Sequence, residues 1–457
     1  MVCVGIMFFS SPVLLAQDQK SESNSFEYIL DSIHSEFMEE EKAIKIYLPE
    51  GYSEEKVYPV IYTLDAEWMF EPTTTEVKKL ADFDVIPECI VVGLFHESRD
   101  KDLGTDWSEG TFDKNGLAFY HYLSEELIPQ IDARYSTSGF NTLVGHSNGA
   151  TFSTHVMIEE DQPFGGFVAL SQNLFGSQKN KYSEFLKQSR DETLFYFVAS
   201  GQRDPLDRLE SGLALDSLFK TNSNEGIITQ HKIYDADHDG IAALGLGDGL
   251  VHVFSKYKRY NAENYELMDE LMAKGVSAYE FIENHARKLN QLYGIDYEIK
   301  QSDIGFMDGM AQTTEELESL EKFEIEHLGK SEDFYSSYAQ SYEYIKNYDK
   351  ALAYWKRYLE INESTVSHPF YFKRTIQLLY SKMNQPLDAI RFALEWKEKK
   401  NELAPYFNYW IAVIARAEKI ETKTGLSSIK EYIANYDEEY PFDLAQAKEI
   451  ENDLSTE

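Results

Sequence analysis

Cysteine is almost absent from this chain, which has two among its 457 residues, Cys3 and Cys89. So small a number excludes the disulfide framework of a small, loop-rich secreted domain. Cys89 lies in the apolar stretch "IPECIVVGLF", where we expect a buried and unreactive thiol.

Positive charge is also scarce. Lys and Arg number 43 against 79 Asp and Glu, which gives a formal net charge of -36. A field of this sign repels phosphate backbones, so nucleic acid is excluded as an expected partner. Metal-ligand patterns are missing as well, because the histidines are scattered and neither H-E-x-x-H nor a paired-cysteine motif occurs. We therefore expect neither a metal nor a cofactor.

The N-terminal apolar run is too short to span a membrane. It reads "MVCVGIMFFSSPVLLA", ends in small residues and is followed by an abruptly polar segment. This layout predicts a secretory signal peptide over residues 1–16, cleaved after Ala16, and a secreted or periplasmic protein. Cleavage would remove Cys3 and leave Cys89 without an intrachain partner. No Lys or Arg precedes the apolar run, and a buried N-terminal strand is the alternative interpretation.

Residues 17–258 are predicted to form one α/β domain. Short β-rich runs such as "YPVIYTLD", "CIVVGLF", "NTLVGHS", "FGGFVALS", "TLFYFVAS" and "TQHKIYD" alternate with helical patterns such as "LAFYHYLSEELIPQIDARY". This alternation predicts a mainly parallel sheet with helices on both faces. In such sheets, reactive groups gather at the carboxyl ends of the strands.

The remaining chain is predicted to be all helical, with a linker over 259–312 and repeats over 313–457. The segments "YIKNYDKALAYWKRYLEI" and "MNQPLDAIRFALEWKE" can be superimposed with Ala351 over Ala389, and small residues there let paired helices approach closely. This part resembles the tetratricopeptide repeat family, and a generic helical bundle is the alternative. A protein or peptide partner is the expected ligand of such a tail.

One short motif carries the candidate chemistry. The stretch "TLVGHSNGATF" has the form strand, G-x-S-x-G, helix, the setting in which Ser147 would occupy a strained turn with its hydroxyl exposed. In this fold an acid and then a histidine follow in the chain. Asp204 comes directly after the strand "TLFYFVASG", and His238 lies in a loop after the next strand. Asp207 is the alternative acid. A hydrogen bond from Ser147 to His238, and another from His238 to the acid, would activate the serine hydroxyl as a nucleophile.

Two backbone N–H groups are expected to stabilise the oxyanion of such a reaction. The residue after the nucleophile, Asn148, would supply one. The loop after the third strand, "TLDAEW", would supply the other from Ala66. Trp68 and Tyr62, near this loop, are candidates for the wall of a substrate cleft, and burial in the core is the alternative for both.

Several motifs together resemble a known family. The segments "YPVIYTLDAEWMF", "IVVGLFHESRDKDL", "ELIPQIDARY", "LVGHSNGATF" and "DHDGIAALGLGDGLVHVF" are similar to the esterases of the α/β-hydrolase fold that include enterochelin esterases, esterase D and feruloyl esterases. The resemblance covers about residues 26–258 and implies a serine hydrolase with Ser147, Asp204 and His238 as its triad. Its substrate would be a small carboxylic ester.

Two alternatives to this function are open. One is hydrolysis of an anionic siderophore trilactone, which needs a basic pocket, and near the expected cleft the sequence offers only Arg99, Lys101 and Arg203. The other is an interaction protein with an inactive hydrolase domain and a working helical tail. The retention of serine, acid and histidine in the right order argues against the second.

Overall fold

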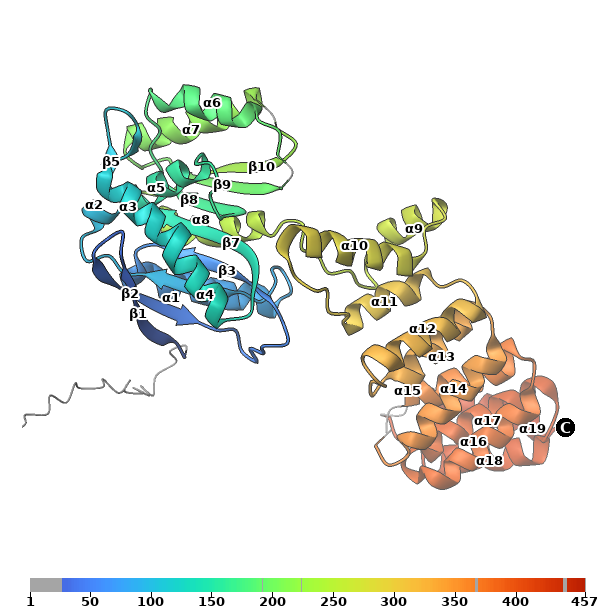
Figure 1. Ribbon diagram of the computed structural model, residues 1–457. Coiled ribbons are helices and arrows are strands. Elements are labelled where there is room, and N and C mark those ends of the chain that lie inside the picture. The colour runs from blue at the N-terminus through green and yellow to red at the C-terminus, as the bar shows by residue number, and fades with distance from the viewer. Residues whose placement is uncertain (1–26, 191, 223, 366–368, 439–441, 457) are drawn as a thin grey trace, which may run out of the picture. The chain divides into compact units, whose positions relative to one another are not determined.

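The computed structural model describes residues 27–456, apart from positions 191, 223, 366–368 and 439–441 (Figure 1). The predicted signal peptide and its cleavage site lie outside the described residues. Two compact units make up the chain. The first runs up to Lys258 and also includes Ala286–Tyr297, and the second consists of Arg259–His285 and the chain from Glu298 onward. The predicted domain limits stay predictions.

The first unit is built on a sheet of eight strands. Their order is β1-β2-β4-β3-β7-β8-β9-β10, in which β1 and β2 pair antiparallel, as do β2 and β4, and all other neighbours are parallel. A separate two-stranded hairpin consists of β5 and β6. The strands are β1 (Ile29–Ser35), β2 (Glu40–Tyr47), β3 (Tyr58–Thr63), β4 (Ile90–Leu94), β5 (Thr105–Asp106), β6 (Thr111–Phe112), β7 (Thr137–His146), β8 (Gly166–Leu170), β9 (Leu194–Gly201) and β10 (Ile227–Tyr234).

Strands β3, β4, β8 and β9 are buried along their whole length because both faces of the sheet are covered there. In β3, for example, all six residues are buried. Tyr62 faces one hydrophobic core and its neighbour Ile61 faces the other. The edge strand β1 has mostly exposed side chains, with only Ile33 and Ser35 buried, and its sequence therefore carries no strong apolar signal.

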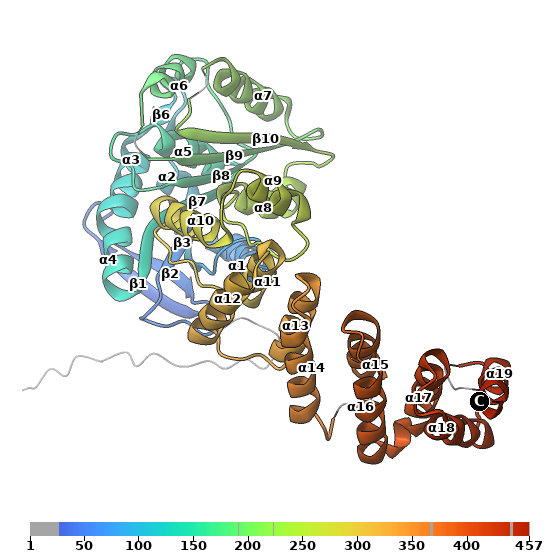
Figure 2. The same cartoon turned by 90° about the vertical axis from the view of Figure 1, so that its right-hand side faces the viewer.

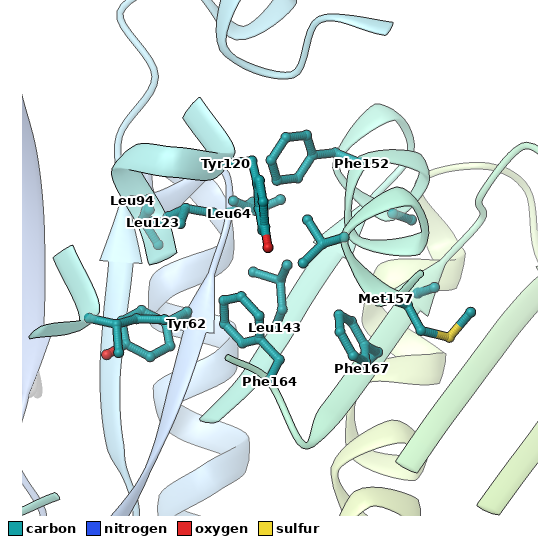
Figure 3. Close-up of a cluster of buried hydrophobic side chains, with 14 of the residues drawn as sticks. Tyr62, Leu64, Leu94, Tyr120, Leu123, Leu143, Phe152, Met157, Phe164 and Phe167 are labelled. Carbon is teal, nitrogen blue, oxygen red and sulfur yellow. The ribbon is translucent and has the colours of Figure 1, made fainter. Parts of the chain in front are cut away.

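Helices cover both faces of this sheet, as Figure 1 shows. The side chains in one core come from Tyr62 of β3, Leu143 of β7 and Phe167 of β8, which meet Phe152 and Met157 of α5 (Figure 3). The predicted fold class is confirmed. This face is covered by α3 (Lys114–His121), η1 (Tyr122–Leu127), α4 (Ile128–Arg134), α5 (Asn148–Met157), α6 (Gln178–Lys187) and α7 (Leu206–Thr221), and the opposite face by α1 (Ala66–Asp82), α8 (Gly240–Val253) and the last residues of α10 (Ala278–Tyr293).

The second unit is helical. In Figure 2, helices α13 to α19 lie side by side in chain order. Ala351 and Ala389 are both fully buried and each is the fourth residue of its helix, which fits the predicted internal repeat. Membership of the tetratricopeptide family stays a prediction. The helices are α9 (Tyr265–Ala273), α11 (Gln301–Met310), α12 (Thr314–His327), α13 (Phe334–Tyr344), α14 (Tyr348–Ile361), α15 (Pro369–Gln377), α16 (Pro386–Lys399), α17 (Ala404–Glu418), α18 (Thr422–Ala434) and α19 (Leu444–Ser455).

No helix in the described ranges combines the length and the hydropathy that a membrane crossing requires.

Candidate active site

The candidate site lies along the carboxyl-terminal edge of five neighbouring parallel strands, β3, β7, β8, β9 and β10. A polar residue follows each strand within four positions: Asp65, Ser147, Ser171, Asp204 and His238. Ligands of open α/β sheets bind at this edge, because the loops that leave it converge there.

Ser147 forms a sharp turn between the last residue of β7 and the first residue of α5, with φ 60° and ψ -121°. Its N–H donates to the carbonyl of Leu170 in β8 at 2.9 Å, and its own carbonyl accepts from Thr151 N–H at 3.0 Å. The turn needs glycine at position 145, because a Cβ there would lie 2.4 Å from the backbone of Gly149. Strand, turn and helix therefore have the geometry that exposes a nucleophilic hydroxyl.

His238 connects Ser147 to Asp204. Its Nε2 lies 2.9 Å from Ser147 Oγ, and its Nδ1 lies 2.8 Å from Asp204 Oδ1. The Asp204 side chain is fully buried, whereas 31% of the His238 side chain is exposed. With a proton on Nδ1 donated to Asp204, Nε2 presents its lone pair to the serine hydroxyl, as a general base must. The structure brings the three predicted residues into one hydrogen-bonded chain, and their catalytic roles stay a prediction.

Asp207, the alternative acid, points elsewhere. It is the second residue of α7 and is exposed. A tight turn after β9, in which Asp204 N–H donates to the Gly201 carbonyl at 3.3 Å, brings Asp204 beneath the imidazole instead. Among the described contacts, the imidazole of His238 has Asp204 as its carboxylate partner.

Ser171 is a site residue that the sequence did not predict. Its hydroxyl donates to Asp204 Oδ2 at 2.6 Å, and its Oγ lies 3.1 Å from His238 Nδ1. The residue is 1% exposed. Its position directly after the buried run "GFVAL" is the signal that could have revealed it, since Ser147 and Asp204 also follow buried strands.

Three non-glycine residues of this edge have left-handed backbones. They are Asp65 with φ 58°, Ser147 with φ 60° and Ser171 with φ 63°, and they follow β3, β7 and β8, which are adjacent in the sheet. Such conformations are unfavourable for residues with a Cβ and persist where the surrounding structure enforces them.

The two predicted oxyanion residues are each the first residue of a helix. Ala66 begins α1 and Asn148 begins α5, after the paired strands β3 and β7. The first N–H groups of a helix have no acceptor within the helix, and the helix dipole places partial positive charge there. Both amides can therefore donate to a bound oxygen. That these two form the oxyanion hole stays a prediction.

Arg99 connects the loop after β3 to the serine turn. Its guanidinium donates from Nε and Nη2 to the two carboxylate oxygens of Asp65, the second at 2.9 Å, and from Nη2 to the His146 carbonyl at 2.9 Å. Burial alone would lower the Arg99 pKa, but the hydrogen bond and charge of Asp65 raise it. This two-point pair fixes Asp65 and hence the start of α1.

The cations expected near the cleft are all paired. Arg99 binds Asp65, Lys101 Nζ lies 3.0 Å from Glu40 Oε2, and Arg203 binds Asp235. Arg208, on the first turn of α7, was not predicted from the sequence as a site residue. Its Nη1 donates to the Ser171 carbonyl at 2.5 Å and its Nη2 to Asn148 Oδ1 at 3.2 Å.

The aromatic residues predicted for the cleft wall differ in position. Trp68 is 44% exposed and packs edge-on against His146, with 5.2 Å between ring centroids. Tyr62 is fully buried in the core of Figure 3, which is the alternative that the sequence left open for it. Tyr62 points inward because side chains alternate along β3 and both faces of that strand are covered.

The other histidines near the motif have structural partners. His146 Nε2 lies 2.9 Å from the His238 carbonyl, and burial lowers the pKa of His146, so this ring donates to the loop of His238. His252 is buried in α8, and its Nε2 lies 3.0 Å from the Ile228 carbonyl.

No group of three or more His, Cys, Asp or Glu side chains is arranged to hold a metal ion within the part of the chain that the structure describes.

Part of the chain matches a protein-family model. Residues 35–225 match the model of the family described as "Putative esterase". That range contains Ser147 and Asp204 and ends before His238. This segment of the chain is therefore esterase-like in sequence, and together with the fold the match supports an ester hydrolase.

Two curated proteins of Bacillus subtilis (strain 168) are similar over part of the chain. The uncharacterized protein YjcH is 28% identical over 142 residues, 30% of this chain and 58% of that protein. The ferri-bacillibactin esterase BesA is 24% identical over 176 residues, 32% of this chain and 60% of that protein. The matched part thus spans less than two thirds of either relative.

Two solved structures share the fold. An uncharacterised protein from Capnocytophaga ochracea has a TM-score of 0.58 at 20% identity, covering 78% of this chain and 100% of that chain. An IroE-like serine hydrolase from Shewanella oneidensis has a TM-score of 0.53 at 22% identity, covering 65% and 99%. At these identities the likeness concerns architecture.

Proposed function

We propose that this protein is a serine hydrolase that cleaves a small carboxylic ester through an acyl-enzyme on Ser147. One observation carries the proposal, the continuous chain of hydrogen bonds from Ser147 Oγ through His238 to Asp204, with distances of 2.9 and 2.8 Å. The family match over residues 35–225 agrees with it.

The geometry accommodates both halves of the reaction. As Ser147 Oγ attacks the ester carbonyl, its proton passes to His238 Nε2, and Asp204 stabilises the imidazolium. The oxyanion would accept hydrogen bonds from the Ala66 and Asn148 N–H groups. Collapse of the intermediate breaks the C–O bond, and the proton on Nε2 goes to the departing alcohol. Water, deprotonated by His238, then attacks the acyl-enzyme and releases the acid and the free serine.

A siderophore trilactone is a less well supported substrate. BesA, named as a ferri-bacillibactin esterase, is similar to less than a third of the chain. A ferric catecholate carries several negative charges, yet Arg99, Lys101 and Arg203 are each neutralised by a carboxylate. An inactive hydrolase domain with a working helical tail has no observation in its favour, because the complete set of reactive groups is retained. Protein or peptide binding by the tail stays a prediction.

Active-site labelling tests the proposed reaction. A fluorophosphonate probe should modify Ser147 with one equivalent per chain, and Ser147→Ala should abolish hydrolysis of p-nitrophenyl acetate while its circular dichroism spectrum is unchanged. Stoichiometric labelling of another serine, with Ser147 unmodified, would refute the mechanism.

Export is a separate part of the proposal. It rests on the sequence of residues 1–16 and predicts a mature chain that begins at Gln17. N-terminal sequencing of the protein from its native host decides this point, and an intact Met1 in the cytoplasm contradicts it.

A further inference from the structure

Arg208 differs from the other cations around Ser147 in having no carboxylate partner. Among the described residues, no ion pair within 4.0 Å involves it, and both of its hydrogen bonds go to neutral oxygens, the Ser171 carbonyl and the Asn148 side chain. This is unusual in a chain with a net charge of -36. The carboxylates of Asp204 and Asp207 act on it only at longer range.

The two hydrogen bonds place the Arg208 guanidinium beside the reacting groups. Asn148 directly follows the nucleophile, and Ser171 Oγ contacts both Asp204 and His238. A guanidinium has five N–H donors in a planar fork. Two of the donors are used, so up to three can serve a ligand without disturbing the existing bonds.

The surroundings of Arg208 strengthen its attraction for an anion. The residue is half-buried, and burial lowers its pKa, with the charge of Arg99 acting in the same direction. An arginine stays protonated despite such a shift. A charge that is poorly solvated and unpaired gains more from an incoming carboxylate than a fully hydrated one does.

The two residues after Ser171 have buried side-chain atoms without a hydrogen-bond partner among the described residues. Gln172, which follows Ser171, is 1% exposed, and neither Oε1 nor Nε2 of its amide has a hydrogen-bond partner among the described residues. Oδ1 of Asn173, 9% exposed, is unpartnered as well. Buried polar atoms left unpaired cost free energy, so this segment calls for water or a polar ligand.

We propose that Arg208 anchors a carboxylate on the substrate, so that the preferred ester of this hydrolase is a monoanion. The inference rests on the proposed function, since it concerns the substrate of the same Ser147. A half-ester of a dicarboxylic acid carries the carboxylate on its acyl part, and an acylated hydroxybenzoate carries it on the alcohol part. A planar guanidinium can bind the carboxylate of either with two parallel hydrogen bonds.

Matched esters test this anchor. The acyl pair is p-nitrophenyl hemiglutarate and neutral p-nitrophenyl pentanoate, and the alcohol pair is 4-acetoxybenzoate and its neutral methyl ester. In at least one pair the wild-type protein should have the higher kcat/KM for the anion, and the preference should shrink at high salt. Arg208→Gln should reduce the anion-to-neutral ratio of kcat/KM about 10- to 100-fold, the size expected for a charge-assisted hydrogen bond. Arg208→Lys should retain part of the preference for the anionic ester.

Arg203→Gln is the matched control, because it removes an exposed arginine just before α7 that is already paired with Asp235. Arg203→Gln should leave the anion-to-neutral ratio of kcat/KM unchanged in both ester pairs. If Arg208→Gln lowers kcat/KM equally for the anionic and the neutral ester, Arg208 only holds Asn148 in place, and the inference is overturned. A wild-type protein with equal kcat/KM for the anionic and the neutral ester of both pairs would also overturn the inference, and this result needs no variant. If no ester is hydrolysed and Ser147 resists labelling, the proposed function itself fails.

Discussion

Ser171 donates its hydroxyl hydrogen to Oδ2 of Asp204 across 2.6 Å, while the other oxygen of that carboxylate faces His238 at 2.8 Å. The buried acid thus has a hydrogen-bond donor on each oxygen. Because Ser171 also reaches to 3.1 Å from His238 Nδ1, its hydroxyl fixes the acid and the ring relative to each other. We therefore regard Ser171 as a positioning residue.

Replacement of Ser171 separates its hydroxyl from its backbone. Ser171→Ala and Ser171→Gly both remove the donor, and kcat on p-nitrophenyl acetate should fall about 10- to 100-fold in each. Glycine accepts the φ of 63°, so the Gly variant should be about 1–2 kcal/mol more stable than the Ala variant. Steady-state kinetics and urea denaturation measure the two effects. A Gly variant with wild-type kcat would show that the hydroxyl has no role.

The two neighbouring aspartates offer a second matched pair. Asp204→Asn should lower kcat about 10²- to 10⁴-fold, because the imidazole loses the acceptor that orients it. Asp207→Asn, on an exposed side chain at the start of α7, should stay close to the wild-type rate. Equal losses in both variants, measured with the same ester, would contradict the assignment of the acid.

The two glycines of the serine motif should respond differently to alanine. A Cβ on Gly145 would meet backbone atoms of Gly149 at 2.4 Å, and neither segment can move without displacing strand or helix. A Cβ on Gly149 would meet Leu64 Cδ1 at 3.3 Å and Asp65 Oδ2 at 3.4 Å. Gly145→Ala should cost at least about 2 kcal/mol of stability. Gly149→Ala should cost less than about 1 kcal/mol, since alanine favours the helix. The midpoints of urea denaturation measure the stability of the two variants relative to the wild type.

Truncation should show that the α/β unit ends later than residue 258. Tyr293 is fully buried, its ring lies 5.0 Å from that of Phe140, and its hydroxyl donates to the Val253 carbonyl at 3.0 Å. A chain that ends at Tyr297 should be folded and hydrolyse p-nitrophenyl acetate. A chain that ends at Lys258 leaves this part of the core exposed and should aggregate or melt at a lower temperature. Equal melting temperatures would contradict this boundary.

Asp308 should make the helical unit less stable as pH rises. Burial, together with the charge of Glu324, raises its pKa to about 6, although Ser341 donates to Oδ2 at 2.7 Å. The folded state then holds a proton that the unfolded state has lost above pH 4. The contribution of Asp308 to stability is therefore fully present below about pH 4 and is lost as the pH rises through about 6, by on the order of 2 to 3 kcal/mol.

Asp308→Asn tests this dependence. The amide cannot ionise, so the variant should be more stable than wild type at pH 8 and close to it at pH 4. Denaturation of the helical unit, followed at both pH values, measures the difference. A wild-type chain that is equally stable at pH 4.5 and pH 7.5, after correction with the Asn variant, would contradict the shift.

The architecture of the first unit could be predicted because its central strands are buried on both faces. Runs such as "YPVIYTLD" and "TLFYFVAS" are mostly apolar, and each contains a fully buried parallel strand. Strand β1 and the hairpin of β5 and β6 were missed. The hairpin strands have two residues each, and β1 lies at the sheet edge with few buried side chains. Short or exposed strands leave little trace in hydrophobicity.

The reactive serine, acid and histidine could be located because each follows a recognisable strand in a fixed chain order. The residues that support these three side chains could not be located from the sequence. Ser171 and Arg208 act through contacts that join residues 33 and 60 positions apart, and serine and arginine are common in loops and helices. Arg99 was recognised as a cation, but its pairing with Asp65 depends on a contact across 34 positions. Such pairings depend on tertiary structure.

The left-handed backbones of Asp65, Ser147 and Ser171 have a consequence for the temperature range in which the protein can work. Each such residue costs about 1–3 kcal/mol, and all three lie at the same edge of adjacent strands. The central sheet has to enforce these conformations, so loosening of this edge releases their cost before the core melts. Heating should therefore end turnover some degrees below the transition seen by circular dichroism, and the loss should reverse on cooling for as long as the sheet stays intact.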